Sequence, residues 1–231
     1  MRPLTPLTAP VEITSLATRP QVKTIHAVNS ARRAQAKQNR YDGVEIDINR
    51  KDGQLVAAHD PSRFDKAVPL ETIFAALEKP ESKTFWLDLK INLTQDEINY
   101  IKDLARRYHI NPRRILFETS AGPQADLLNA NGLTILLQLP SEFIEDAGNA
   151  QKRAQLNAQL EELLRRYQPF AISASLGKYP YLKTYFPHYN KAIYSSTTVR
   201  PSLKKYFLAR AIMQDPTVQV WMQDEYTFLP F

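Results

Sequence analysis

The sequence predicts a closed (β/α)8 TIM barrel, α/β in class and folded as a single domain. Apolar, β-branched segments alternate with amphipathic segments of helical period, and we count eight of the former with seven of the latter between them. A chain of 231 residues has a suitable length for one such barrel. Parallel strands need helical crossovers, and closure removes exposed sheet edges. We therefore divide the chain into residues 1–20, a Pro/Thr-rich N-terminal tether, and residues 21–231, the barrel domain.

The first elements are indicated by local sequence patterns. Short apolar runs predict strands at residues 22–28, 43–49 and 84–90, and a longer connection with a Lys-Asp-Gly turn follows the second of them. Helices are predicted at residues 30–40 and 69–77. The next helix starts with Thr94-Gln95-Asp96-Glu97, a capping box in which two side chains bond free backbone amides.

The second half continues the alternation without interruption. A long helix is predicted from Leu156, Leu160, Leu163 and Leu164, whose spacing places them on one buried face. The main alternative, an open doubly wound sheet, would normally have a glycine-rich turn after the first strand, whereas this chain has HAVNS. The remaining elements are strands at residues 114–119, 133–139, 170–176, 191–197 and 218–223, and helices at residues 123–131, 150–167, 177–189 and 202–213.

Charged residues lie inside two of the apolar strands. In a barrel strand, alternate residues face the helices and the interior, so the apolar residues of the second and third strands face outward. Glu45 and Asp47 on the second strand then point inward, together with Trp86, Asp88 and Lys90 on the third. The outward residues are Val44, Ile46, Ile48, Phe85, Leu87 and Leu89. Three carboxylates are therefore expected to converge at one mouth of the barrel.

Such a cluster needs compensation, because a buried carboxylate either costs several kcal/mol or takes up a proton. One divalent cation would supply it, and an all-oxygen site in a chain without cysteine favours Mg²⁺ or Ca²⁺. The alternative is a structural network in which Lys90 and nearby arginines pair with the acids.

Two of the four histidines are expected near the same mouth. His26 ends the first strand, and His59 lies in the connection after the second. Such a pair can deprotonate an attacking hydroxyl and protonate a departing oxygen, while a metal ion neutralises a phosphoryl group. His109 and His188 follow helices, and we interpret both as surface or structural residues.

The stretches IHAVNSARRAQ, YDGVEIDINRKDGQLVAAHDPSR, VPLETIFAALE and FWLDLK together resemble the glycerophosphodiester phosphodiesterase pattern. They reproduce an N-terminal histidine, an E-x-D pair, a KDG turn followed by His-Asp, and an acid two residues before a lysine. The opening His-Ala-Val-Asn is similar to that of the menorin family and of sphingomyelinase D-like phospholipases. These three families belong to the phospholipase C-like superfamily. The resemblance of this chain to them covers roughly residues 25–90.

This resemblance implies a metal-dependent phosphoric diester hydrolase, or a cyclising lyase, that acts on glycerophosphodiesters or phospholipid headgroups. The alternative it leaves open is a menorin-like binding protein with the same barrel and little turnover. The implied roles are metal ligation by Glu45, Asp47 and Asp88, acid-base catalysis by His26 and His59, and phosphate contact by Lys90.

Further residues are candidates for substrate contact. Asn29 could hold a metal-bound water or a phosphate oxygen, or cap the following helix, and Trp221 could wall the pocket. Strand alternation also predicts that the following side chains point into the barrel: Glu118, Ser173, Ser175, Tyr194 and Gln223.

Composition limits the partners. The net charge of +6 and the pI near 9.4 favour anionic partners, including peripheral contact with an anionic membrane surface. The basic residues are scattered over the helices, which indicates a solvated surface and no nucleic-acid partner. No apolar run is long enough for a transmembrane segment. The N-terminus lacks the core of a signal peptide, and with the absence of cysteine this favours an exported protein whose signal was removed over a cytoplasmic one.

Overall fold

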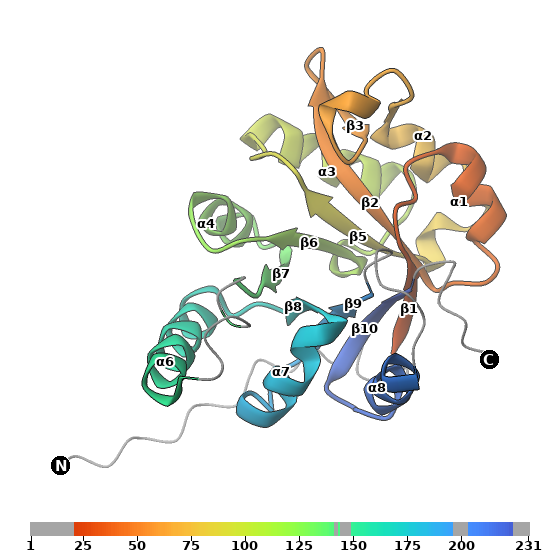
Figure 1. Ribbon diagram of the computed structural model, residues 1–231. Coiled ribbons are helices and arrows are strands. Elements are labelled where there is room, and N and C mark those ends of the chain that lie inside the picture. The colour runs from red at the N-terminus through yellow and green to blue at the C-terminus, as the bar shows by residue number, and fades with distance from the viewer. Residues whose placement is uncertain (1–20, 141–142, 144–148, 196–202, 224–231) are drawn as a thin grey trace.

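The computed structural model describes residues 21–140, 143, 149–195 and 203–223 (Figure 1). The predicted tether at residues 1–20 lies outside the described residues, as do residues 196–197 of the predicted seventh strand and residue 202 at the start of the last predicted helix. Of the side chains in the last helix, those of residues 203–205 are not described.

Eight parallel strands close into a barrel within the described residues, which confirms the predicted fold class. The strands follow one another in the order β1-β10-β9-β8-β7-β6-β5-β2, and pairing of β1 with β2 closes the ring. Their bounds are β1 Val22–Ile25, β2 Gly43–Lys51, β5 Thr84–Leu89, β6 Ile115–Thr119, β7 Thr134–Gln138, β8 Ala171–Ser175, β9 Lys191–Tyr194 and β10 Val218–Gln223.

Helices surround the barrel on its outside (Figure 1). Residues 94–97 form the predicted capping box, with the Thr94 hydroxyl accepting from the Glu97 amide and the Glu97 carboxylate accepting from the Thr94 amide. No described helix is long and apolar enough to cross a membrane. The helices are α1 Ala31–Lys37, α2 Leu70–Ala75, α3 Gln95–Arg107, α4 Pro123–Ala130, α6 Ala150–Tyr167, α7 Tyr179–Tyr185 and α8 Leu203–Met213, with 3-10 turns η1 Pro61–Arg63, η2 Pro80–Ser82, η3 Pro112–Arg114 and η4 Leu176–Lys178.

The connection after β2 is a hairpin rather than an irregular loop. β2 continues beyond the barrel and pairs antiparallel with β3 (Gln54–Ala57), which pairs in turn with β4 (Val68–Pro69). Asp52 and Gly53 form the turn with φ of 49° and 77°, and two such positive angles match the twist of antiparallel strands. The Asp-Gly pair therefore encodes a hairpin where only a longer connection was expected.

The buried residues form two groups, as strand alternation requires. The larger group includes Val44, Ile46, Phe85 and Leu87 and lies between the strands and the helices. The smaller group fills the barrel interior and includes Trp86, which is fully buried. The remaining members of this inner group are Leu116, Leu136, Phe170, Ala171, Ala192, Val220 and Met222.

The predicted inward orientation of Trp221 is wrong. Val220 and Met222 belong to the inner group, whereas Trp221 is fully buried in the outer one. The reason is a register shift between Val218 and Val220, where β10 has one residue more than β9. Such a bulge reverses the alternation that follows it. Trp221 therefore does not wall a pocket in the barrel, and the inward parity predicted for Gln223 is lost in the same way.

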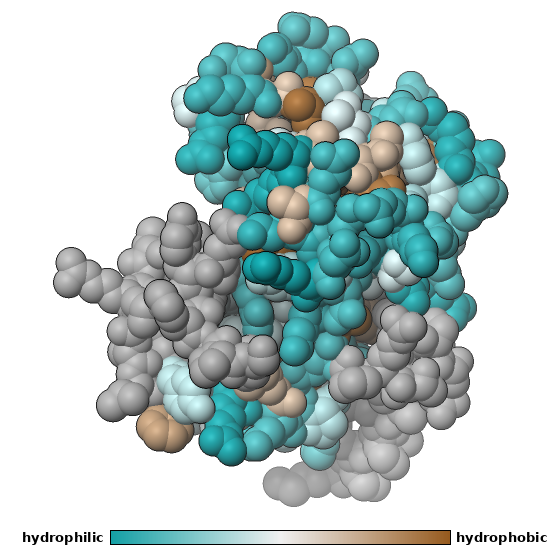
Figure 2. Space-filling view, turned by 90° about the vertical axis from the view of Figure 1, so that its right-hand side faces the viewer, coloured by the Kyte–Doolittle hydropathy of each residue, from teal (hydrophilic) through white to brown (hydrophobic). Residues whose placement is uncertain are grey.

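The visible surface is mainly polar. On the face shown in Figure 2, the described residues are mostly hydrophilic, and hydrophobic residues appear in small separate patches. Among the described residues, the large hydrophobic side chains with substantial exposure are Tyr185, Tyr206 and Phe207. Peripheral contact with an anionic membrane surface, which was predicted from the net charge, therefore stays a prediction.

Replacement of Gly43 by alanine is expected to destabilise the barrel by about 3 kcal/mol, within the range for overpacking. A Cβ atom at Gly43 would lie 2.4 Å from the carbonyl oxygen of Thr84 and 2.8 Å from Cγ2 of Thr24, so two neighbouring strands would have to separate. Urea unfolding measures the effect. The matched control is Gly177→Ala, whose added Cβ meets no atom within 4 Å. Equal unfolding midpoints for the two variants would contradict this close approach.

Candidate metal and active site

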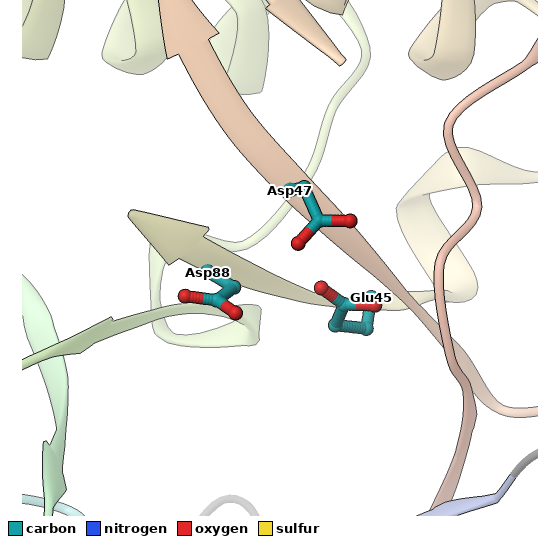
Figure 3. Close-up of side chains that lie close together, drawn as sticks. All are labelled: Glu45, Asp47 and Asp88. Carbon is teal, nitrogen blue, oxygen red and sulfur yellow. The ribbon is translucent and has the colours of Figure 1, made fainter. Parts of the chain in front are cut away.

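Glu45, Asp47 and Asp88 lie together on two neighbouring strands, with Asp47 and Asp88 near the carboxyl end of the parallel pairing of β2 and β5. Asp47 of β2 is paired in register with Asp88 of β5, and Glu45 precedes Asp47 by two residues on the same face. One carboxylate oxygen from each lies within 4.8 Å of the other two. Figure 3 shows the three side chains facing one another between the two strands. This is the end of a (β/α)8 barrel at which active sites form.

Backbone and side-chain donors from the loop after β1 hold two of the acids. The Ala27 amide donates to Glu45 Oε2 at 2.5 Å, and Ala27 has a φ of 56°, which is uncommon for a residue other than glycine. The Asn29 Nδ2 group donates to Asp47 Oδ2 at 2.6 Å, while Asn29 Oδ1 accepts from the Asp47 amide at 3.1 Å. Neutral donors of this kind orient carboxylates for a ligand.

Asn29 therefore supports an acid, a role that was not among those predicted for it. The neighbouring Ser30 caps helix α1 by accepting from the Arg33 amide. The sequence could not distinguish these roles, because the contact between Asn29 and Asp47 joins segments 18 residues apart.

Lys90 connects two of the acids. Its Nζ lies 3.0 Å from Asp47 Oδ1 and 2.5 Å from Asp88 Oδ2. Burial lowers the pKa of Lys90, but Asp88 and then Asp47 outweigh burial, and the pKa is raised. Lys90 therefore pairs with the acids, as in the structural network that was the alternative to a metal site. Its single positive charge nevertheless compensates only one of the three carboxylates when all are ionised.

Glu45 shows why this compensation is incomplete. Its side chain is 1% exposed, and its Oε1 has no hydrogen-bond partner. Burial raises the pKa of Glu45 well above its ordinary value, and the charge of Asp47 raises it further. A buried carboxylate oxygen without a donor, beside two other carboxylates, fits a hard divalent cation that prefers oxygen ligands.

The two predicted catalytic histidines occupy different positions at this mouth. His26 lies beside the cluster, with Nε2 3.9 Å from Glu45 Oε2 and a side chain that is 29% exposed. His59 follows β3, and the preceding amide of Ala58 donates to the backbone oxygen of Asp47. The His59 side chain is 57% exposed, and its Nδ1 lies 3.3 Å from Asp60 Oδ2. The structure thus brings His26 close to the acids and places His59 at the rim.

Glu118 is a fourth carboxylate inside the barrel, paired in register with Asp88. It is buried and accepts from Trp86 Nε1 at 2.8 Å and from the Ser173 hydroxyl at 2.5 Å. Burial, with a smaller effect of Asp88, raises its pKa from an ordinary 4.5 to about 7. The Tyr194 ring packs edge-on against Trp86. Glu118, Ser173 and Tyr194 therefore all point into the barrel, as predicted.

Replacement of Glu118 by glutamine is expected to change the pH dependence of stability. Between pH 4.5 and about 7, the folded state keeps a proton that the unfolded state releases, so the stability of the wild type falls as pH rises. At about 1.4 kcal/mol per pH unit, the loss relative to Glu118→Gln is about 3 kcal/mol. Urea unfolding at pH 4.5 and pH 8 measures both chains. Parallel pH curves for the two would show that Glu118 titrates normally.

A groove of about 740 Å³ lies elsewhere, outside the barrel, between the β3 hairpin and helices α2 and α3. Gln54, Glu71, Asp96, Tyr100 and Tyr108 are among its lining residues. None of the predicted site residues lines it, so it is separate from the acidic cluster.

Neither a family model nor a curated protein sequence matches this chain. Solved structures do match. A glycerophosphodiester phosphodiesterase from Thermotoga maritima has a TM-score of 0.57 at 12% identity, covering 88% of this chain and 94% of the other. A glycerophosphodiester phosphodiesterase from Parabacteroides distasonis has a TM-score of 0.56 at 13% identity, with 90% and 94% covered.

Phosphoribosyl anthranilate isomerase from Thermococcus kodakaraensis matches with a TM-score of 0.51 at 11% identity, covering 88% of each chain. What the three share with this chain is the barrel. Because one fold supports enzymes as different as these, the likeness shows the fold alone, and the chemistry must be argued from the site.

Proposed function

We propose that this protein is a divalent-metal-dependent phosphodiesterase acting on glycerophosphodiesters or phospholipid headgroups. The observation that carries the proposal is the cluster of Glu45, Asp47 and Asp88, in which the buried Oε1 of Glu45 has no hydrogen-bond partner. His26 lies beside this cluster at the barrel mouth. The sequence resemblance over residues 25–90 and the two phosphodiesterase structures of the same fold support it.

Each group has a chemical role in this proposal. Glu45, Asp47 and Asp88 would hold Mg²⁺ or Ca²⁺, which would supply positive charge to the phosphoryl oxygens. One histidine takes the proton of the attacking hydroxyl as its oxygen bonds to phosphorus. The other gives a proton to the alcohol oxygen as its bond to phosphorus breaks. When the attacking hydroxyl belongs to the substrate, the product is a cyclic phosphate, and water can then open it.

Asp60 supports the assignment of His59. When the imidazole donates Nδ1–H to Asp60, its Nε2 is left as the atom that exchanges a proton. Asp60 is fixed in turn, because it accepts from both the amide and the hydroxyl of Ser62. The exposed position of His59 suits a group that meets the substrate at the rim.

A panel of glycerophosphodiesters, lysophospholipids and sphingomyelin, each with Mg²⁺ or Ca²⁺, tests the proposal. The expected result is metal-dependent release of an alcohol, and separation of cyclic from open phosphate products identifies the reaction type. Metal binding without turnover on any phosphodiester would instead favour a menorin-like binding protein, which the HAVNS opening also resembles.

A further inference from the structure

We infer that Lys90 is a built-in competitor for the cation, holding the acids together until a divalent ion binds and then turning toward the substrate phosphate. This inference rests on the proposed metal-dependent function and assigns a regulatory role to one of its residues. It predicts that the lysine lowers metal affinity, although it lies in the candidate metal site.

The occupancy of the carboxylate oxygens is the first argument. Of the six oxygens of Glu45, Asp47 and Asp88, four already contact a donor. Two of these contacts come from the neutral groups of Ala27 and Asn29, which orient the acids without opposing a cation. The other two, on Asp47 Oδ1 and Asp88 Oδ2, come from the Lys90 ammonium. A cation that binds Asp47 through Oδ1 or Asp88 through Oδ2 must share that oxygen with the ammonium or displace it, and a cation on any other oxygen of these two carboxylates still lies close to the ammonium charge.

Charge is the second argument. When all three carboxylates are ionised, as they would be around a metal ion, they and the Lys90 ammonium have a local charge of −2, which a divalent ion neutralises completely. A site without the lysine would have a charge of −3 and would attract the same ion more strongly. Two cations on the same oxygens also repel each other at a distance at which screening by salt is weak.

The anchoring of Lys90 allows it to move. Its backbone amide donates to the Ile48 oxygen at 3.0 Å, so its Cα is fixed at the end of β5. Its side chain is 24% exposed, and the ammonium lies at the end of a flexible four-carbon stem. The charge can therefore leave Asp47 and Asp88 without any change in the strand, and the barrel mouth is where the phosphate would lie.

Calorimetric titration of Mg²⁺ and of Ca²⁺ into the wild type and Lys90→Met tests the inference. The variant is expected to bind the ion at least about tenfold more tightly. A tenfold change in affinity is about 1.4 kcal/mol, which is less than the repulsion between two charges about 4 Å apart near a protein surface. The melting temperature of Lys90→Met in chelator is expected to fall below that of the wild type, while its gain on addition of metal is expected to be larger.

Lys152→Met is the matched control, because it removes the same charge from the exposed part of helix α6 and should leave affinity within about twofold. If Lys90→Met does not fold, Lys90→Gln carries the same expectation. Metal binding by the wild type with equal or weaker binding by the Lys90 variant would overturn this inference alone. An absence of binding in both chains would overturn it together with the proposed function.

Discussion

Replacement of His26 or of His59 by alanine is expected to lower kcat for phosphodiester cleavage by about 10²–10⁴-fold, the usual contribution of a general acid or base. Both side chains are partly exposed, so neither replacement should leave a large cavity or unfold the barrel. Steady-state kinetics on the most active phosphodiester measures the effect, and circular dichroism checks the fold.

His188→Ala is the control for these variants, because His188 is exposed after α7 and has no predicted role. Its kcat should match that of the wild type. The position of His59 at the rim makes its variant the more demanding test. Full activity in the His59 variant would remove it from the mechanism, and full activity in both variants would contradict the proposed acid-base pair.

Replacement of Glu45 by glutamine is expected to have opposite effects on function and stability. The variant loses one of the three clustered carboxylates, a buried one with an oxygen that has no hydrogen-bond partner, so metal affinity should fall by more than about tenfold, and activity with it. The same change removes a buried charge whose pKa is raised by burial and by Asp47. In chelator at neutral pH, the variant should therefore melt several degrees above the wild type, since about 1 kcal/mol shifts the melting temperature by roughly 2–4 °C in a chain of this size.

The pH dependence gives this prediction a definite sign. A carboxyl group with a raised pKa destabilises the folded state above its ordinary pKa, so the advantage of Glu45→Gln should disappear near pH 4 and grow as pH rises. Thermal melting in chelator at pH 4 and at pH 8 measures it. A Glu45→Gln variant that is less stable than the wild type at both pH values would show that the cluster is a structural ion-pair network.

The sequence predicted the barrel and the faces of its strands well, because both depend on local periodicity. Alternation along β2 and β5 was sufficient to predict that Glu45, Asp47 and Asp88 converge. The same rule failed at Trp221, because one extra residue in β10 reverses the alternation and no local pattern marks it. The hairpin after β2 could have been predicted from Asp52-Gly53, whose type of turn is encoded locally.

The contacts that surround the acids could not be predicted in the same way. The bonds from Ala27 to Glu45 and from Asn29 to Asp47 depend on how the loop after β1 crosses β2. The placement of Lys90 on two carboxylates depends on a rotamer at the end of β5. Glu118 had inward parity in the sequence, but its bonds with Trp86 and Ser173 and its raised pKa follow from tertiary packing.

The central claim is that Glu45, Asp47 and Asp88 bind one divalent cation. Anomalous diffraction from a crystal grown with Mn²⁺ tests it most directly, since Mn²⁺ takes the oxygen ligands of Mg²⁺ and Ca²⁺. The expected result is one peak about 2.0–2.6 Å from an oxygen of each of the three carboxylates. A crystal in Mn²⁺ at millimolar concentration with no peak at this mouth, or with its peak among other residues, would contradict the account.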